Sequence, residues 1–160
     1  MLVEISLRRV INITVGCNLS NRWVLESDRW LEQAFENLRA AEDNMKTGHY
    51  AWSCFLSQQA AECALKSIFY LIGIEKFGHS VLDLLLDLSA ELNLEVSDLM
   101  NCARLLDKHY AAPRYANMHP HTRSPPYKLY GESDAERCLS CAYTIIRFVK
   151  KLKKSLIEKK

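Results

Sequence analysis

The chemistry of this sequence is concentrated in residues 107–130, DKHYAAPRYANMHPHTRSPPYKLY. This segment contains three histidines, two arginines, two lysines, four tyrosines and four prolines, and its single carboxylate, Asp107, stands at its first position. Cations without acidic neighbours favour the binding of an anion, and a guanidinium group can hold phosphate through two parallel hydrogen bonds. The segment therefore predicts a site for a phosphate-bearing ligand.

The predicted ligand-binding residues are cationic, aromatic or amide side chains: Lys66, Arg114, Tyr115, Asn117, Arg123 and Tyr127. Tyrosine rings can stack on a base, as aromatic rings do in many proteins that bind single-stranded RNA. In the alternative interpretation, the aromatic rings and prolines hold the segment against the protein while the cations face water. The sequence leaves both interpretations open.

Gln59, Glu62 and Lys66 follow one another at spacings of three and four residues, so they form a polar stripe on a predicted helix that is otherwise largely apolar. A structural network that ties this helix to its neighbours is one explanation. The functional alternative is that the stripe lines a groove beside the basic segment.

Cys138 and Cys141 form a CxxC pair, which in other proteins binds zinc or performs thiol chemistry. Here the pair falls inside a predicted helix, and the sequence has no second CxxC and no HxxxH that would complete a set of four ligands. His119 and His121, with His109, lack a neighbouring thiol. We therefore predict core cysteines, no metal ion and no cofactor.

Helical periodicity dominates the sequence after residue 27. We expect five helices: one that Ser27 or Asp28 caps and Gly48 ends, one over 49–72, one that begins at Ser80 with Asp83, one that begins at Ser97, and one that begins with the capping pair Ser133 and Glu136. The connection 111–131 shows no helical periodicity, and its length favours a functional segment. The fold class is all-α, a five-helix up-and-down bundle over residues 27–158, preceded by an extension at 1–26 that is either ordered or disordered.

Bulk properties exclude several classes of protein. The chain has 160 residues, 49% of them hydrophobic and 25% charged, which is typical of one globular domain. Its apolar runs are too short to span a membrane, and its N-terminus lacks the features of a secretory signal. We expect a cytoplasmic protein with reduced cysteines. The basic run from Arg147 to Lys160 is explained by a solvated helix end, although it would also attract RNA.

Several stretches resemble, in order, the short archaeal and bacterial form of the HEPN family, the higher eukaryotes and prokaryotes nucleotide-binding domain. The most specific are QQAAECALK at 58–66, the isolated His79, and LDKHYAAPRY at 106–115. The resemblance covers roughly residues 28–150. It implies a five-helix bundle, like that of the substrate-binding subunits of nucleotidyltransferases, which commonly dimerises and often acts with a minimal nucleotidyltransferase.

Many members of this family are metal-independent ribonucleases that use an arginine and a histidine four to six residues apart, a rule that Arg114 and His119 satisfy. Histidine can move the 2′-hydroxyl proton while arginine holds the phosphate. However, another branch reads arginine, tyrosine, proline, acid. Ala116 and Asn117 would replace its last two residues, and His119 would then be an ordinary loop residue.

Three functions follow as hypotheses. The first is a nucleotide- or RNA-associated binding module, and the second is a toxin-like endoribonuclease that uses Arg114 and His119. The third is a structural homodimer whose partner protein performs the chemistry, because the apolar face of the last helix continues to Leu156.

Overall fold

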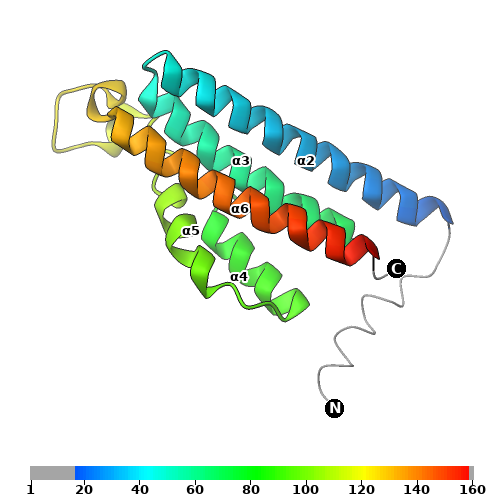
Figure 1. The fold of residues 1–160 in the computed structure, drawn as a ribbon. Coiled ribbons are helices and arrows are strands. Elements are labelled where there is room, and N and C mark those ends of the chain that lie inside the picture. The colour runs from blue at the N-terminus through cyan, green and yellow to red at the C-terminus, as the bar shows by residue number, and fades with distance from the viewer. Residues whose placement is uncertain (1–16, 159–160) are drawn as a thin grey trace.

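The computed structural model describes residues 17–158, which form helices and turns and no strand. The helices are, in chain order, α2 (Cys17–Lys46), α3 (Tyr50–Leu71), α4 (Val81–Leu92), α5 (Met100–Asp107) and α6 (Glu132–Glu158). Short 3-10 turns lie between these helices, at Ser97–Leu99, Ala116–Met118 and Pro126–Leu129. The prediction of an all-α, five-helix bundle is confirmed for this part of the chain (Figure 1).

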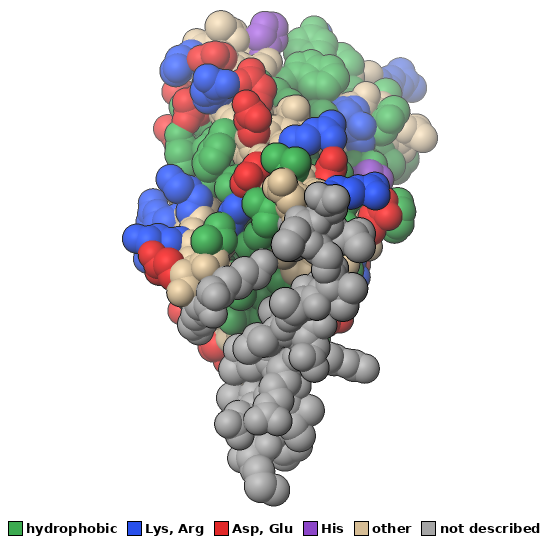
Figure 2. Space-filling view, turned by 90° about the vertical axis from the view of Figure 1, so that its right-hand side faces the viewer, with side chains coloured by type: hydrophobic (Ala, Val, Ile, Leu, Met, Phe, Trp, Pro, Cys, Tyr) green, Lys and Arg blue, Asp and Glu red, His purple; other side chains and the backbone are tan. Residues whose placement is uncertain are grey.

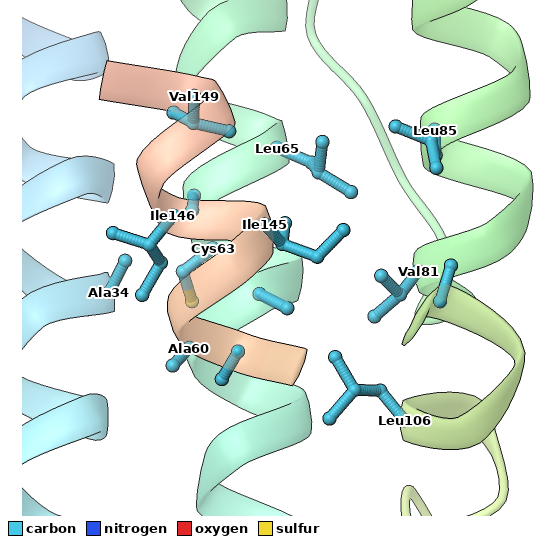
Figure 3. Close-up of a cluster of buried hydrophobic side chains, with 14 of the residues drawn as sticks. Ala34, Ala60, Cys63, Leu65, Val81, Leu85, Leu106, Ile145, Ile146 and Val149 are labelled. Carbon is cyan, nitrogen blue, oxygen red and sulfur yellow. The ribbon is translucent and has the colours of Figure 1, made fainter. Parts of the chain in front are cut away.

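The helices α2 and α3 lie side by side and run in opposite directions, and α6 packs along them (Figure 1). The turn between α2 and α3 contains Gly48 at a φ of 79°. Glycine adopts this left-handed conformation without the steric penalty that a Cβ atom brings, which permits so short a connection. The shorter α4 and α5 cover the side of α3 and α6 that faces away from α2 (Figure 3).

The hydrophobic core lies between α3 and α6 and extends to the helices on both sides (Figure 3). Ile145 and Val149 of α6 are fully buried, as are Leu65 of α3 and Leu85 of α4. Ile145 and Val149 lie at the spacing that the sequence predicted for the apolar face of the last helix. Leu156, at the end of that face, is only half-buried but still packs against the core.

The first helix begins earlier than predicted. We expected Ser27 or Asp28 to cap it, yet α2 begins at Cys17 and continues through both residues. Ser27 is buried and its hydroxyl accepts a hydrogen bond from Lys153 Nζ at 2.9 Å, while Asp28 Oδ1 lies 2.7 Å from the same atom. Their polar side chains therefore bind α6 instead of capping the start of α2. Residues 1–16 of the expected extension lie outside the described residues.

The last helix begins at Glu132, one residue before the predicted cap. The expected pair of Ser133 and Glu136 does not form. Instead Asp134 Oδ2 accepts a hydrogen bond from the backbone N–H of Gly131 at 3.0 Å, and this contact and Arg137 lower the pKa of the Asp134 carboxyl. A carboxylate in the first turn is favourable because the N-terminal end of a helix carries partial positive charge.

None of the helices between residues 17 and 158 combines the length and the apolar character that a membrane span requires. On the face shown in Figure 2, basic and acidic side chains are interspersed with apolar ones. The described part of that face therefore has no single large basic surface, which agrees with the small net charge of the chain, +2.

Candidate phosphate-binding site

Asp107, the carboxylate that opens the basic segment, is fully engaged in holding the start of α4. Its Oδ1 accepts a hydrogen bond from Val81 N at 2.6 Å, and its Oδ2 accepts from Ser80 Oγ at 2.7 Å and from Leu82 N at 3.2 Å. The first N–H groups of a helix have no partner within the helix, so the carboxylate satisfies them from another element. Asp107 therefore does not neutralise the cations that follow it in the sequence.

Arg114 is held by aromatic rings and by the backbone. Its guanidinium carbon lies 4.3 Å from the ring centre of Phe55 in α3, 4.6 Å from that of Tyr110 and 5.0 Å from that of Tyr115. Its Nε donates a hydrogen bond to the carbonyl oxygen of Tyr110 at 2.8 Å. Within residues 17–158 no carboxylate lies at ion-pair distance from Arg114, and its two terminal nitrogens form no hydrogen bond. These nitrogens are the pair that binds a phosphate or carboxylate in bidentate fashion.

The polar stripe of α3 is a buried network around Glu62, whose side chain is 4% exposed. Glu62 Oε2 accepts hydrogen bonds from Gln59 Nε2 at 3.0 Å and from Gln58 Nε2 at 3.2 Å. Its Oε1 lies 2.9 Å from Lys66 Nζ and 3.1 Å from His79 Nδ1. The buried carboxylate is thus fully satisfied, as the burial of a charged group requires. This arrangement is the structural network that the sequence suggested as one explanation.

His79 joins this network to Arg114. Its ring stacks on that of Tyr110, with ring centres 4.6 Å apart and an angle of 15° between the planes, and the guanidinium of Arg114 contacts the same tyrosine ring. An ionised carboxylate only accepts hydrogen bonds, so His79 Nδ1 donates to Glu62. Because the His79 side chain is 58% exposed, this tautomer leaves Nε2 free to accept a hydrogen bond from a ligand.

Glu62, His79 and Arg114 each come from a different one of the three stretches that carry the family resemblance. The contacts Glu62–His79, His79–Tyr110 and Tyr110–Arg114 bring these stretches together. The HEPN domain family matches residues 27–152. The chain belongs to this family.

Relatives of this HEPN domain agree with the assignment. A protein of Methanocaldococcus jannaschii that bears the name "Putative toxin" is 30% identical over 127 residues, which are 76% of this chain and 84% of that protein. A crystal structure from Thermus thermophilus is 41% identical, with a TM-score of 0.74, and covers 79% of this chain and 97% of its own. An archaeal HEPN homologue is 38% identical, with a TM-score of 0.66 and the same two coverages. A HEPN domain protein of Thermotoga maritima is 35% identical, with a TM-score of 0.62, and the alignment covers 79% of this chain and 98% of that one.

The long connection of the HEPN domain, 111–131, is fixed to the bundle. His119 Nε2 lies 2.9 Å from the carbonyl oxygen of Ala112 and, since a carbonyl only accepts, donates to it. Pro113 and Pro126 are buried, and burial raises the pKa of the half-buried Tyr130 to about 12. His119 therefore has its Nε2 committed to the loop itself, and its Nδ1 forms no hydrogen bond with the described residues.

The structure separates the other predicted ligand-binding residues. Tyr115 contacts Arg114 and is half-exposed, so it extends the aromatic surface beside the guanidinium. Lys66 is buried, pairs with Glu62 and lies over the Trp30 ring at 5.2 Å, so it is not an exposed cation. Asn117, Arg123 and Tyr127 are exposed on the same connection, and within the described residues no hydrogen bond or ring contact joins them to Arg114.

Two hollows on the described surface have similar charge. The larger, with a volume of about 630 Å³, lies beside α2, and its charged lining residues are Glu26, Arg29, Glu32, Glu36 and Arg39. The smaller, of about 260 Å³, lies beside the imidazole of His79 and is also lined by Lys76, Asp83 and Asp87. In each hollow the carboxylates outnumber the arginine and lysine side chains by one, so neither hollow by itself favours a phosphate.

The sequence did not single out His79 or Tyr110 as site residues. His79 appeared only as part of the family resemblance, and Tyr110 was one tyrosine among four in its segment. The indication that was available is Glu62, because a buried acid on an apolar helix requires partners, and a histidine is a common one. Which histidine supplies it depends on the fold.

Proposed function

We propose that this HEPN domain is a nucleotide- or RNA-associated binding module, with the phosphate held by Arg114 and the partner protein a minimal nucleotidyltransferase. The observation that carries the proposal is the state of Arg114: a guanidinium oriented by aromatic rings and a backbone carbonyl, without a carboxylate partner among residues 17–158. An arginine that only stabilises the fold commonly pairs with an acid. This one retains both terminal nitrogens for a ligand.

The neighbouring groups suit a nucleotide. The exposed ring of Tyr115 offers a surface on which a base can stack, and base–aromatic stacking tolerates any base. The ring of His79 stacks on that of Tyr110, and its Nε2 can accept a hydrogen bond from a ribose hydroxyl.

The test is a binding titration with a fluorescent oligoribonucleotide and, separately, with a mononucleotide, at two salt concentrations and with a chelator present. We expect Arg114→Ala to weaken binding about 10- to 100-fold, the effect of losing one charge-assisted contact. Arg104→Ala is the matched control, because Arg104 is an exposed arginine of α5 that bonds only Asn101. Equal affinities of the two variants, or no binding by the unaltered chain, would contradict the proposal.

An endoribonuclease is the second candidate, because a relative bears the name "Putative toxin". Arg114 would hold the phosphate, with His119 as the residue that moves the proton. Cleavage of the same oligoribonucleotide in the presence of the chelator would support it. His119→Ala and His79→Ala then distinguish the proton carrier, since only the catalytic histidine should reduce cleavage with binding retained. A scaffold that acts only through its partner protein would neither bind the oligoribonucleotide or mononucleotide nor cleave the oligoribonucleotide.

A further inference from the structure

Three side chains able to bind a metal converge in the core, away from the network around Glu62. Cys54 comes from α3, Cys138 from α6, and His109 from the turn that follows α5. The two sulfur atoms and one ring nitrogen of His109 all lie within 4.8 Å of one another. Both cysteines are fully buried. The sequence predicted Cys138 as a core residue that forms a CxxC pair with Cys141, but the fold places Cys138 beside a cysteine and a histidine from other elements.

His109 gives the second indication. Its Nδ1 is buried and has no hydrogen-bond partner among the described residues. Buried polar atoms almost always have a partner, and an unsatisfied one is commonly explained by an ion or a water molecule. The imidazole is also positioned by packing, since its ring meets that of Tyr130 edge to face with centres 5.6 Å apart. Packing therefore fixes the imidazole beside the two cysteines, and the thiol of Cys138 is its nearest polar group.

We propose that Cys54, His109 and Cys138 bind a thiophilic divalent metal ion, with Zn²⁺ the best match. Two thiolates and an imidazole are ligands that zinc prefers over the oxygen-binding ions Mg²⁺ and Ca²⁺. Two thiolate charges also cancel the charge of the ion, so the complex is neutral and suits a buried position.

The geometry requires a small adjustment. Zinc binds sulfur at about 2.3 Å and nitrogen at about 2.0 Å in a tetrahedral arrangement, which places ligand atoms roughly 3.5 Å apart. The largest separation in the cluster is at most 4.8 Å, so side-chain rotations of about 1 Å close it. A tetrahedral ion held by three protein ligands takes one further ligand.

The test is a titration of the full chain, stripped of metal and kept reduced, with Co²⁺ as a spectroscopic probe and Zn²⁺ as competitor. We expect one Co²⁺ per chain, with the near-ultraviolet charge-transfer band of cobalt–thiolate bonds, and loss of the band when Zn²⁺ displaces it. This measurement needs no variant, so it remains decisive even where a core substitution impairs folding. No charge-transfer band on the unaltered chain would overturn the proposal.

Variants assign the ligands. Cys54→Ala, Cys138→Ala and His109→Ala should each weaken metal binding by at least about tenfold. Cys102→Ala and Cys141→Ala are the matched controls, because these two thiols form a separate pair at the α5–α6 contact. Cobalt binding that survives in Cys54→Ala, or that disappears equally in the Cys102→Ala control, would place the metal elsewhere. The experiment contains no nucleotide, so its result is independent of the proposed function.

Discussion

At the scale of single residues, the burial of Glu62 affects the groups around it. Its carboxylate has four partners in contact distance, and its negative charge reaches the neighbouring thiol of Cys63. Burial, in the first place, and the charge of Glu62, in the second, raise the pKa of Cys63 from 9.0 to about 11. The folded protein therefore keeps a proton on this sulfur under conditions in which an unfolded chain loses it.

This difference predicts a loss of stability at alkaline pH. The contribution of Cys63 is complete below pH 9, and it is lost as the pH rises from 9 to 11, because only the folded chain holds the proton in that range. The share of the free energy of unfolding that Cys63 contributes should fall by on the order of 2 kcal/mol over this interval. Urea unfolding at several pH values measures it, and Cys63→Ala should show a smaller decline. An identical decline in both proteins would contradict the assignment to Cys63; burial also raises the pKa of Cys141, to about 12, so some decline should remain.

Single residues were predicted unevenly from the sequence. Arg114 was predicted as a ligand-binding residue because its segment lacks acids, a feature that needs no knowledge of the fold, and this stays a prediction. Its contact with Phe55 was not predicted, because Phe55 lies in α3, far away in the sequence. Lys66 was predicted to bind the ligand, because the sequence does not show which residues of α3 are buried. The structure buries it beside Glu62.

At the scale of elements, α4 is held at its first turn by a residue of α5. Ser80 caps α4 by accepting a hydrogen bond from Asp83 N at 3.0 Å, as the sequence predicted. Asp107 adds a second layer by binding the hydroxyl of Ser80 and two backbone N–H groups. Because Asp107 is followed directly by the turn that contains Tyr110, the same contact orients the start of the candidate site.

We expect Asp107→Asn to lower the free energy of unfolding by about 1–3 kcal/mol, since it weakens charge-assisted hydrogen bonds to a helix N-terminus. Asp98→Asn, at an exposed aspartate just before α5, is the matched control and should change stability by less than about 0.5 kcal/mol. Denaturant unfolding measures both. A loss of the same size in the two variants would show that the contact to α4 is not the cause.

The caps show where local sequence suffices and where it fails. The cap at Ser80 depends on residues three apart, and it was predicted correctly. The contact from Asp107 joins residues far apart in the sequence, so only the fold reveals it. The predicted start of α2 was wrong because it also depends on contacts between distant residues. Ser27 and Asp28 resemble a cap locally, but Lys153 of α6 uses their oxygen atoms.

At the scale of the whole molecule, Lys153 joins the first described helix to the last. Among the described residues of the C-terminal basic run, Arg147, Lys150, Lys151 and Lys154 are exposed, as predicted. Lys153, however, is 7% exposed and binds both Ser27 and Asp28. A buried ammonium group needs such partners, because leaving it or them unpaired is costly. The run is therefore not one uniform solvated face.

Lys153→Ala should lower the free energy of unfolding by about 1–3 kcal/mol, because the buried hydroxyl of Ser27 loses its donor. The neighbouring Lys154 provides a matched control, since its side chain is exposed and its ion pair with Glu158 is long, at 3.7 Å. Lys154→Ala should change stability by less than about 0.5 kcal/mol. Thermal and urea unfolding of the two variants compare them directly. Equal stabilities would rule out the contact between α2 and α6 as a stabilising one.

The hydrogen bond between Gln58 Nε2 and the carbonyl oxygen of His79, 2.7 Å long, has a consequence for the evolution of the chain. It anchors the backbone at the end of the connection 72–79, while the imidazole of the same residue must reach Glu62. An inserted or deleted residue here would move the ring away from its carboxylate, although none of residues 72–79 is buried. Descendants that retain the histidine should therefore conserve the length of this linker more strictly than its composition.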